Sequence, residues 1–114
     1  MVDRRFVCRK LSDITTTVTS HNIGLKQVLL AKNETSSAIT QIAVTTLRGG
    51  EFVEEHVHET MDEHFIFQSG RGWMFVDGEQ IKCTDGVFLL IPAGTPHSMR
   101  SDEDLRFVTI GVAL

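Results

Sequence analysis

The sequence predicts an all-β fold, a sandwich or barrel formed by a single domain. Three observations indicate it: the apolar runs are short, turn signals separate them at intervals of about ten residues, and a 3.6-residue helical period is almost absent. The chain has 114 residues, which suffices for one core and is too short for two ordinary domains. No repeat or low-complexity stretch divides it.

The first strands are expected between residues 24 and 47. The runs GLKQVLLA (24–31) and AITQIAVTTL (38–47) are apolar or β-branched, and the polar stretch KNETSS separates them. Before them, the Ser/Thr-rich LSDITTTVTS is β-prone but cannot bury much on its own. We therefore predict an N-terminal arm or edge strand over residues 1–24 and the barrel domain over residues 25–114.

Turn signals are clearer in the second half of the chain. Asp77-Gly78 separates GWMFV from EQIKC and is the two-residue signal of a tight hairpin. The continuous apolar run VFLLI (87–91) predicts a strand buried on both faces. Prolines at both ends make the following loop PAGTP stiff, and LRFVTIGVAL supplies the last strand.

Composition excludes several classes of protein. Apolar residues make up 41% and charged residues 23%, and the net charge of −4 gives no support for nucleic-acid binding. No segment approaches the roughly 20 apolar residues of a membrane span, and the basic N-terminus never reaches the apolar run of a signal peptide. Cys8 and Cys83 lie far apart without a CxxC pattern, so we expect two free thiols and a cytoplasmic protein.

The stretch EEHVHETMDEH, residues 54–64, concentrates three histidines and five acidic residues. On a strand His56 and His58 would share one face, roughly 6.6 Å apart, which suits two rings converging on one metal ion. Glu63 would join them only if the chain bends at ETMD, and His64 would then point away. A solvated acidic surface is the alternative, but the apolar residues on either side weaken it. A zincin site fails because the histidines are six residues apart rather than four.

Two longer patterns resemble the cupin superfamily. Residues 50–70 fit its first motif, G(x)5HxH(x)3–4E(x)6G, at every fixed position. Residues 86–97 fit G(x)5PxG(x)2H, and the second motif, which extends to residue 101, departs only at Ser101, where the family has Asn. That position holds no metal ligand in the family. The chain is thus identified as similar to the small, single-domain cupins.

This resemblance implies a jelly-roll β-barrel with one divalent transition metal inside, held by His56, His58, Glu63 and His97. Mixed nitrogen and oxygen ligands suit iron, manganese, zinc, nickel or cobalt alike, so the sequence does not choose among these metals. The resemblance also implies turns or bulges at the motif glycines, where a Cβ would clash, and a homodimer paired through sheet edges and the N-terminal arm. The motif glycines are Gly50, Gly70, Gly86 and Gly94.

Residues next but one to a ligand should line the same cavity. This rule selects Phe65, Phe67 and Met99, with Trp73 or Phe75 nearby, although all of them could equally fill the core. Arg71, like Lys82, Arg100 and Arg106, is a candidate for binding an acidic substrate. His21 has no assigned place.

Two function classes remain open. The first is a small metalloenzyme (dioxygenase, decarboxylase or isomerase/epimerase) acting on a small oxygen-rich or carboxylate metabolite. The second is a non-catalytic domain that binds or senses a metal or a small ligand. The fold alone does not decide between them.

Overall fold

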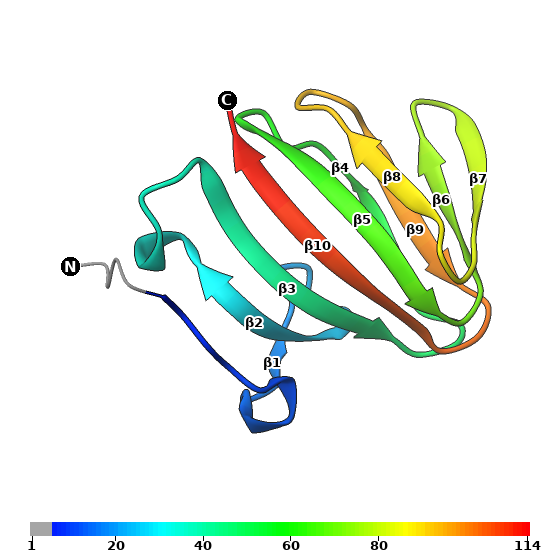
Figure 1. The fold of residues 1–114 in the computed structure, drawn as a ribbon. Coiled ribbons are helices and arrows are strands. Elements are labelled where there is room, and N and C mark those ends of the chain that lie inside the picture. The colour runs from blue at the N-terminus through cyan, green and yellow to red at the C-terminus, as the bar shows by residue number, and fades with distance from the viewer. Residues whose placement is uncertain (1–5) are drawn as a thin grey trace.

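Two antiparallel sheets face each other in the computed structural model, which describes residues 6–114 (Figure 1). The six-stranded sheet has the order β1-β2-β3-β10-β5-β8, and the four-stranded sheet has the order β4-β9-β6-β7. The predicted all-β jelly roll is confirmed. The strands are β1 (Thr17–Val18), β2 (Leu25–Ala31), β3 (Ile39–Leu47), β4 (Phe52–His56), β5 (Met61–Ser69), β6 (Gly72–Val76), β7 (Glu79–Cys83), β8 (Phe88–Ile91), β9 (His97–Ser101) and β10 (Leu105–Ala113), with short 3-10 turns η1 (Leu11–Asp13) and η2 (Lys32–Glu34).

The C-terminal strand β10 lies in the middle of the larger sheet, between β3 and β5. Its alternate residues point between the sheets, so Phe107 packs beside Phe65 and Phe67, with ring centroids 5.8 and 5.4 Å away. Burying one such ring contributes about 1.5–3 kcal/mol. Met74 and Leu105, both 0% exposed, complete this part of the core from β6 and β10. The aromatic core therefore holds the two sheets together.

Tight turns confirm the predicted hairpin. Asp77 and Gly78 have φ of 46° and 84°, the two positive values that a type I′ turn needs. Gly70 also has positive φ, 96°, and a Cβ there would lie 1.9 Å from the Asp104 carbonyl oxygen. The other three motif glycines have positive φ as well, but a Cβ on them would meet nothing within 4 Å. Backbone conformation, rather than the expected clash, accounts for those three.

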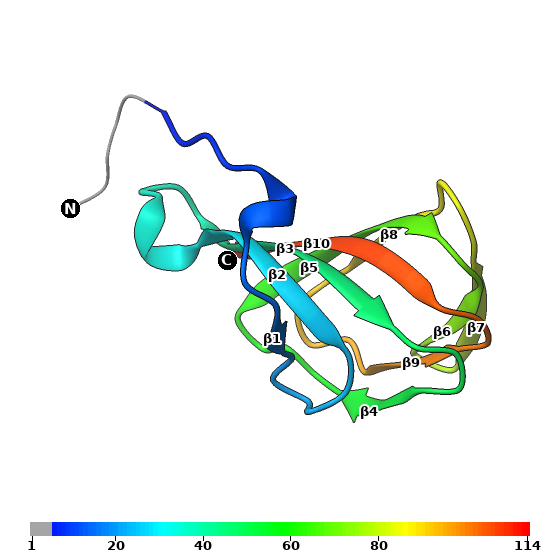
Figure 2. The same ribbon diagram turned by 90° about the horizontal axis from the view of Figure 1, so that it is seen from below.

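The N-terminal segment runs along the outside of the larger sheet. β1 is the edge strand and pairs antiparallel with β2, and the Gln27 side-chain amide donates to the carbonyls of Leu11 and Ile14 at 3.0 and 3.1 Å. Figure 2 shows the loop after β1 reaching toward β4 at the open end of the sandwich. Residues 1–5 of the expected arm lie outside the described residues. None of the helices in residues 6–114 has the length and apolar character that crossing a membrane requires.

Candidate metal centre

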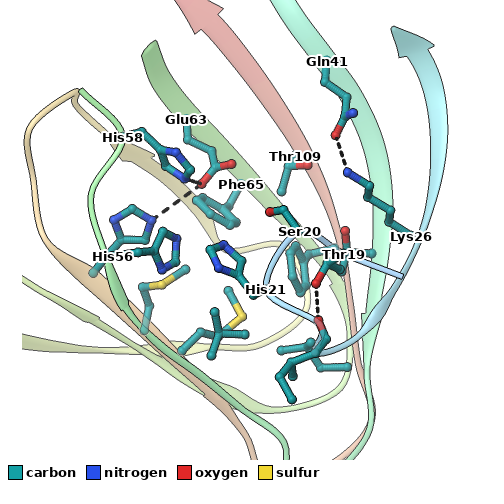
Figure 3. A pocket seen from close by; sticks show the side chains of 18 of the residues that line it. Thr19, Ser20, His21, Lys26, Gln41, His56, His58, Glu63, Phe65 and Thr109 are labelled. Carbon is teal, nitrogen blue, oxygen red and sulfur yellow. Dashed lines mark hydrogen bonds and ion pairs between the residues drawn. The ribbon is translucent and has the colours of Figure 1, made fainter. Parts of the chain in front are cut away.

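Three histidines meet at the open end of the sandwich. His56 is the last residue of β4 and His97 the first of β9, and the two are paired across the strands with ring centroids 4.2 Å apart. His58 follows in the turn after β4. One ring nitrogen from each of the three lies within 4.8 Å of the other two (Figure 3). That spacing suits a shared ion, because metal–nitrogen bonds are about 2.1 Å long.

A bulge in β4 directs His56 inward. Val53 pairs with Met99 and His56 with His97, so three steps on β4 oppose two on β9. The strand then ends, and His58 lies in the turn that follows it. The sequence interpretation had instead considered His56 and His58 on one face of the same strand. The Gly94 N–H donates to the His58 carbonyl at 2.8 Å. The loop of the second motif thus fixes the turn of the first.

Glu63 reaches the histidines from β5. Its Oε1 lies 3.6 Å from His58 Nε2 and 3.7 Å from His97 Nε2. The chain turns at residues 57–60, slightly before the predicted ETMD, and this turn allows Glu63 to face inward. His64 faces the other side of the sheet, where its Nδ1 lies 3.0 Å from the Ile110 carbonyl oxygen. It takes no part in the cluster.

Backbone carbonyls orient two of the rings. His56 Nδ1 lies 2.8 Å from the Glu54 oxygen, and His97 Nδ1 lies 2.9 Å from the Thr95 oxygen. Because a carbonyl only accepts, each Nδ1 carries the proton and each Nε2 keeps a lone pair. Metal-binding histidines are commonly held in this way.

The Nε2 atom of His97 is the strongest indication that this cluster suits a metal ion. The side chain is buried, and this nitrogen has no hydrogen-bond partner among the described residues. A buried polar atom without a partner costs about 1–3 kcal/mol. Its lone pair faces a second and a third imidazole and one carboxylate, a donor set that fits a divalent transition metal.

The same surroundings shift the pKa values of two rings in opposite directions. Burial lowers the pKa of His56, and the neighbouring rings of His97 and His58 lower it further against the opposing bond to Glu54. Burial also lowers the pKa of His97, but the Glu63 carboxylate and the Thr95 carbonyl outweigh it, and the net direction is upward. Glu63 therefore supplies the negative charge that stabilises a cation at this place.

A cavity of about 180 Å³ adjoins the cluster. Phe65 and Met99 line it as expected, whereas Phe67 is buried beneath it in the core. Trp73 and Phe75 do not line it, because β6 turns Met74 inward and its two neighbours outward.

The outward residues of β6 and the loop before it have partners of their own. Trp73 Nε1 donates to Asp102 Oδ2 at 3.0 Å, and the Arg100 guanidinium lies 5.8 Å from the Phe75 ring centroid. Arg71 pairs with Glu103 at 3.2 Å and is likewise away from the cavity. The sequence interpretation named Trp73 or Phe75 as further candidates for the cavity, but a single-sequence pattern with apolar residues at 73, 74, 75 and 76 does not fix which of them face inward.

A polar wall that the sequence interpretation missed faces the cluster. It is contributed by β2, β3, β10 and the loop after β1, and His21 from that loop lies with its ring centroid 4.1 Å from that of His56. No motif marks these positions; only the alternation along β3 and β10 could have pointed to some of them. The polar wall consists of Thr19, Ser20, His21, Lys26, Gln41, Thr45 and Thr109.

Comparison with known proteins identifies the family. The model of the cupin domain matches residues 43–111, more than half of the chain. The chain belongs to the cupin family. A quercetin 2,3-dioxygenase of Bacillus subtilis is 34% identical to this cupin over 81 residues, which are 69% of the chain. The chain spans only 23% of the length of that relative.

Solved structures agree with the fold. A predicted oxalate decarboxylase from Thermotoga maritima superposes with a TM-score of 0.87 at 23% identity, covering 95% of this cupin and 100% of that chain. The ectoine synthase of P. lautus gives 0.83 at 17% identity, covering 95% and 78%. At such identities the likeness shows the fold alone, and the names of these proteins cover different reactions.

Proposed function

We propose that this cupin binds one divalent transition metal through His56, His58, Glu63 and His97 and works as a small metalloenzyme. The observation that carries the proposal is the buried Nε2 of His97, which has no hydrogen-bond partner within residues 6–114 and faces two further imidazoles and a carboxylate. Three neutral imidazoles and one carboxylate would leave a dication with a net charge of about +1, suited to an anionic oxygen ligand.

The cavity beside the ligands favours chemistry over a purely structural role. A metal there would act as a Lewis acid on an oxygen-bearing substrate or as a site for dioxygen. Phe65, Met74 and Met99 would exclude water from one side of the bound substrate, and the polar wall would orient it from the other. The volume of about 180 Å³ lies below the roughly 300–1,000 Å³ of pockets for drug-sized ligands, which favours a small metabolite.

Among the reaction classes, a dioxygenase has the support of the B. subtilis relative. Decarboxylation and isomerisation use the same kind of metal-bound oxygen ligand and remain within the proposal. The alternative, a non-catalytic binding or sensing domain, would have the same donor set but would not turn over any bound acid.

Cobalt(II) substitution tests the proposal. If coordination positions are exchangeable, a small bidentate 2-oxo acid will displace water and change the visible spectrum of the cobalt protein. Chelation should shift the melting temperature only modestly, because the aromatic core already holds the barrel together. Unfolding on chelation, with a spectrum indifferent to every small anion, would instead indicate a metal kept for stability.

We also propose a homodimer. The outer face of β5 and β8 exposes Ile66, Phe88 and Leu90 to 41, 57 and 47%, side chains that a second copy would cover. The N-terminal segment, from which the sequence predicted the pairing, lies in its described part along β2 of its own chain. Light scattering should give twice 12.7 kDa, and Phe88→Ser with Leu90→Ser should shift it to the monomer. A monomer mass for the unaltered protein at micromolar concentration would exclude this dimer.

A further inference from the structure

Lys26 is a cation placed inside the cavity. It lies on β2 opposite Thr45 of β3, and both side chains line the cavity wall. Lys26 is the only lysine or arginine among the described lining residues, and it is partly buried. Within residues 6–114 no carboxylate forms an ion pair with it. A solvated surface lysine would normally turn its ammonium group away from such a wall.

The partner of Lys26 is an amide rather than an acid. Lys26 Nζ donates to Gln41 Oε1 at 3.4 Å. This bond engages the amide oxygen of Gln41 and leaves four donor groups on the pair: two N–H bonds on Gln41 and two further N–H bonds on Lys26. Donors of this number, with a positive charge, fit an anionic acceptor such as a carboxylate.

The register of the larger sheet gives the separation of this pair from the metal cluster. Gln41 and Glu63 are both opposite Gly111, on the two sides of β10. Neighbouring strands are about 4.8 Å apart, so the two residues are about 10 Å apart along one row. Figure 3 shows Lys26 and Gln41 across the cavity from His56, His58 and Glu63, with Ser20 and Thr109 between them.

We propose that Lys26 and Gln41 form an anion subsite, and that the cavity takes a small acid with two anionic ends. One carboxylate is held by the Lys26–Gln41 pair, and the opposite, oxygen-bearing end is directed at the histidines and Glu63. This inference rests on the proposed metal-dependent function and narrows its substrate class to short-chain dicarboxylic acids. The polar wall would then select the substrate, while the histidine side would carry the chemistry.

Two acids that differ at one end provide the test. 2-Oxoglutarate has a distal carboxylate, and 2-oxopentanoate has a methyl group in its place on the same chain. Titration calorimetry on the cobalt(II) protein should show 2-oxoglutarate binding about tenfold or more tightly, as expected for a hydrogen-bonded charge in a partly buried site. Lys26→Met should remove this preference and leave 2-oxopentanoate binding unchanged. Gln41→Leu should weaken the preference by a smaller factor.

Lys82→Met is the matched control, because Lys82 is an exposed lysine on β7 that does not line the cavity. It should keep the preference, although it removes the same charge. If Lys26→Met melts early, Lys26→Gln retains most of the side-chain volume and should lose the preference too.

The outcomes separate the two proposals. Equal affinities for the two acids, no binding of either acid, or an unchanged preference in Lys26→Met would each overturn the subsite. A Lys26-dependent preference, with affinities for both acids that are the same with and without cobalt, would support the subsite and refute the metal site. Loss of affinity for both acids on removal of cobalt would support the metal site, whatever the result at Lys26.

Discussion

The two walls of the cavity differ in how firmly the chain fixes their side chains. On the histidine wall, His56 and His97 are each oriented by a backbone carbonyl at 2.8 and 2.9 Å. On the polar wall, Lys26 and Gln41 hold each other through one long bond of 3.4 Å between two flexible side chains. Backbone-anchored groups suit a geometry that must be exact for metal binding, and flexible groups suit recognition of a substrate that can differ among relatives.

The largest expected effect concerns the histidine wall. His97→Ala should abolish metal binding, a loss greater than the roughly 10–100-fold caused by removing an outer-shell partner. His56→Ala and His58→Ala should act in the same direction. Elemental analysis of the purified variants measures this.

His64→Ala is the control for that experiment, since this ring faces the other side of the sheet. It should retain its metal. Metal loss in His64→Ala together with retention in His97→Ala would show that the ligand assignment is wrong.

The next prediction concerns the stability of the backbone turns in the two motifs rather than the metal ligands themselves. Gly70→Ala should lower the free energy of unfolding by about 3 kcal/mol, because the positive φ and the approach to the Asp104 carbonyl both oppose a Cβ. Gly86→Ala has the same sign of φ and free space, so it should cost only about 1 kcal/mol. Urea unfolding measures both. Equal losses would mean that the contact with Asp104 is unimportant.

The smallest expected effect concerns the reactivity of the two thiols, one in the N-terminal segment and one in the barrel interior. Cys8 is exposed, whereas Cys83 is 0% exposed and burial raises the pKa of its thiol to about 11. At pH 8 one thiol per chain should react with a disulfide reagent in the native protein and two after denaturation.

The same thiol gives a pH dependence. Between pH 9 and 11 only the unfolded chain releases the Cys83 proton, so the free energy of unfolding should fall as pH rises through this range. Cys83→Ala should lack this component of the slope. Rapid labelling of both thiols in the native protein would show that the β7 edge opens readily.

The sequence predicted the fold and the histidine cluster because both follow from local rules. The Asp77-Gly78 turn and the spacing of the two motifs need only short segments of chain to be interpreted. Ser101, the departure from the second motif, is buried, and its hydroxyl donates to the carbonyl of Arg48. This bond fastens the turn before β4 and leaves the site untouched.

The inward directions of Met74, Lys26 and Gln41 could not be predicted, because they depend on packing between strands that are distant in the sequence. Met74 rather than its neighbours faces inward because the whole of β6 must match β9, with Met74 paired to Met99. Lys26 and Gln41 enter the cavity through the register of β2 with β3 and of β3 with β10. A pattern within one strand gives two possible faces, and only the neighbouring strands select one.

The bulge at Glu54–Glu55 has a consequence for the spacing of the inward-facing residues of β4. It shifts the phase of β4 by one residue, so that Val53 before it and His56 after it both face inward. On a regular strand, residues three positions apart face opposite sides, so the bulge is what allows this core side chain and this ligand to stand three positions apart. A chain that lacks one of the two glutamates would place them two positions apart, where a regular strand keeps both facing inward without a bulge. The bulge therefore adds one exposed glutamate next to the ligand without changing which side chains face the interior.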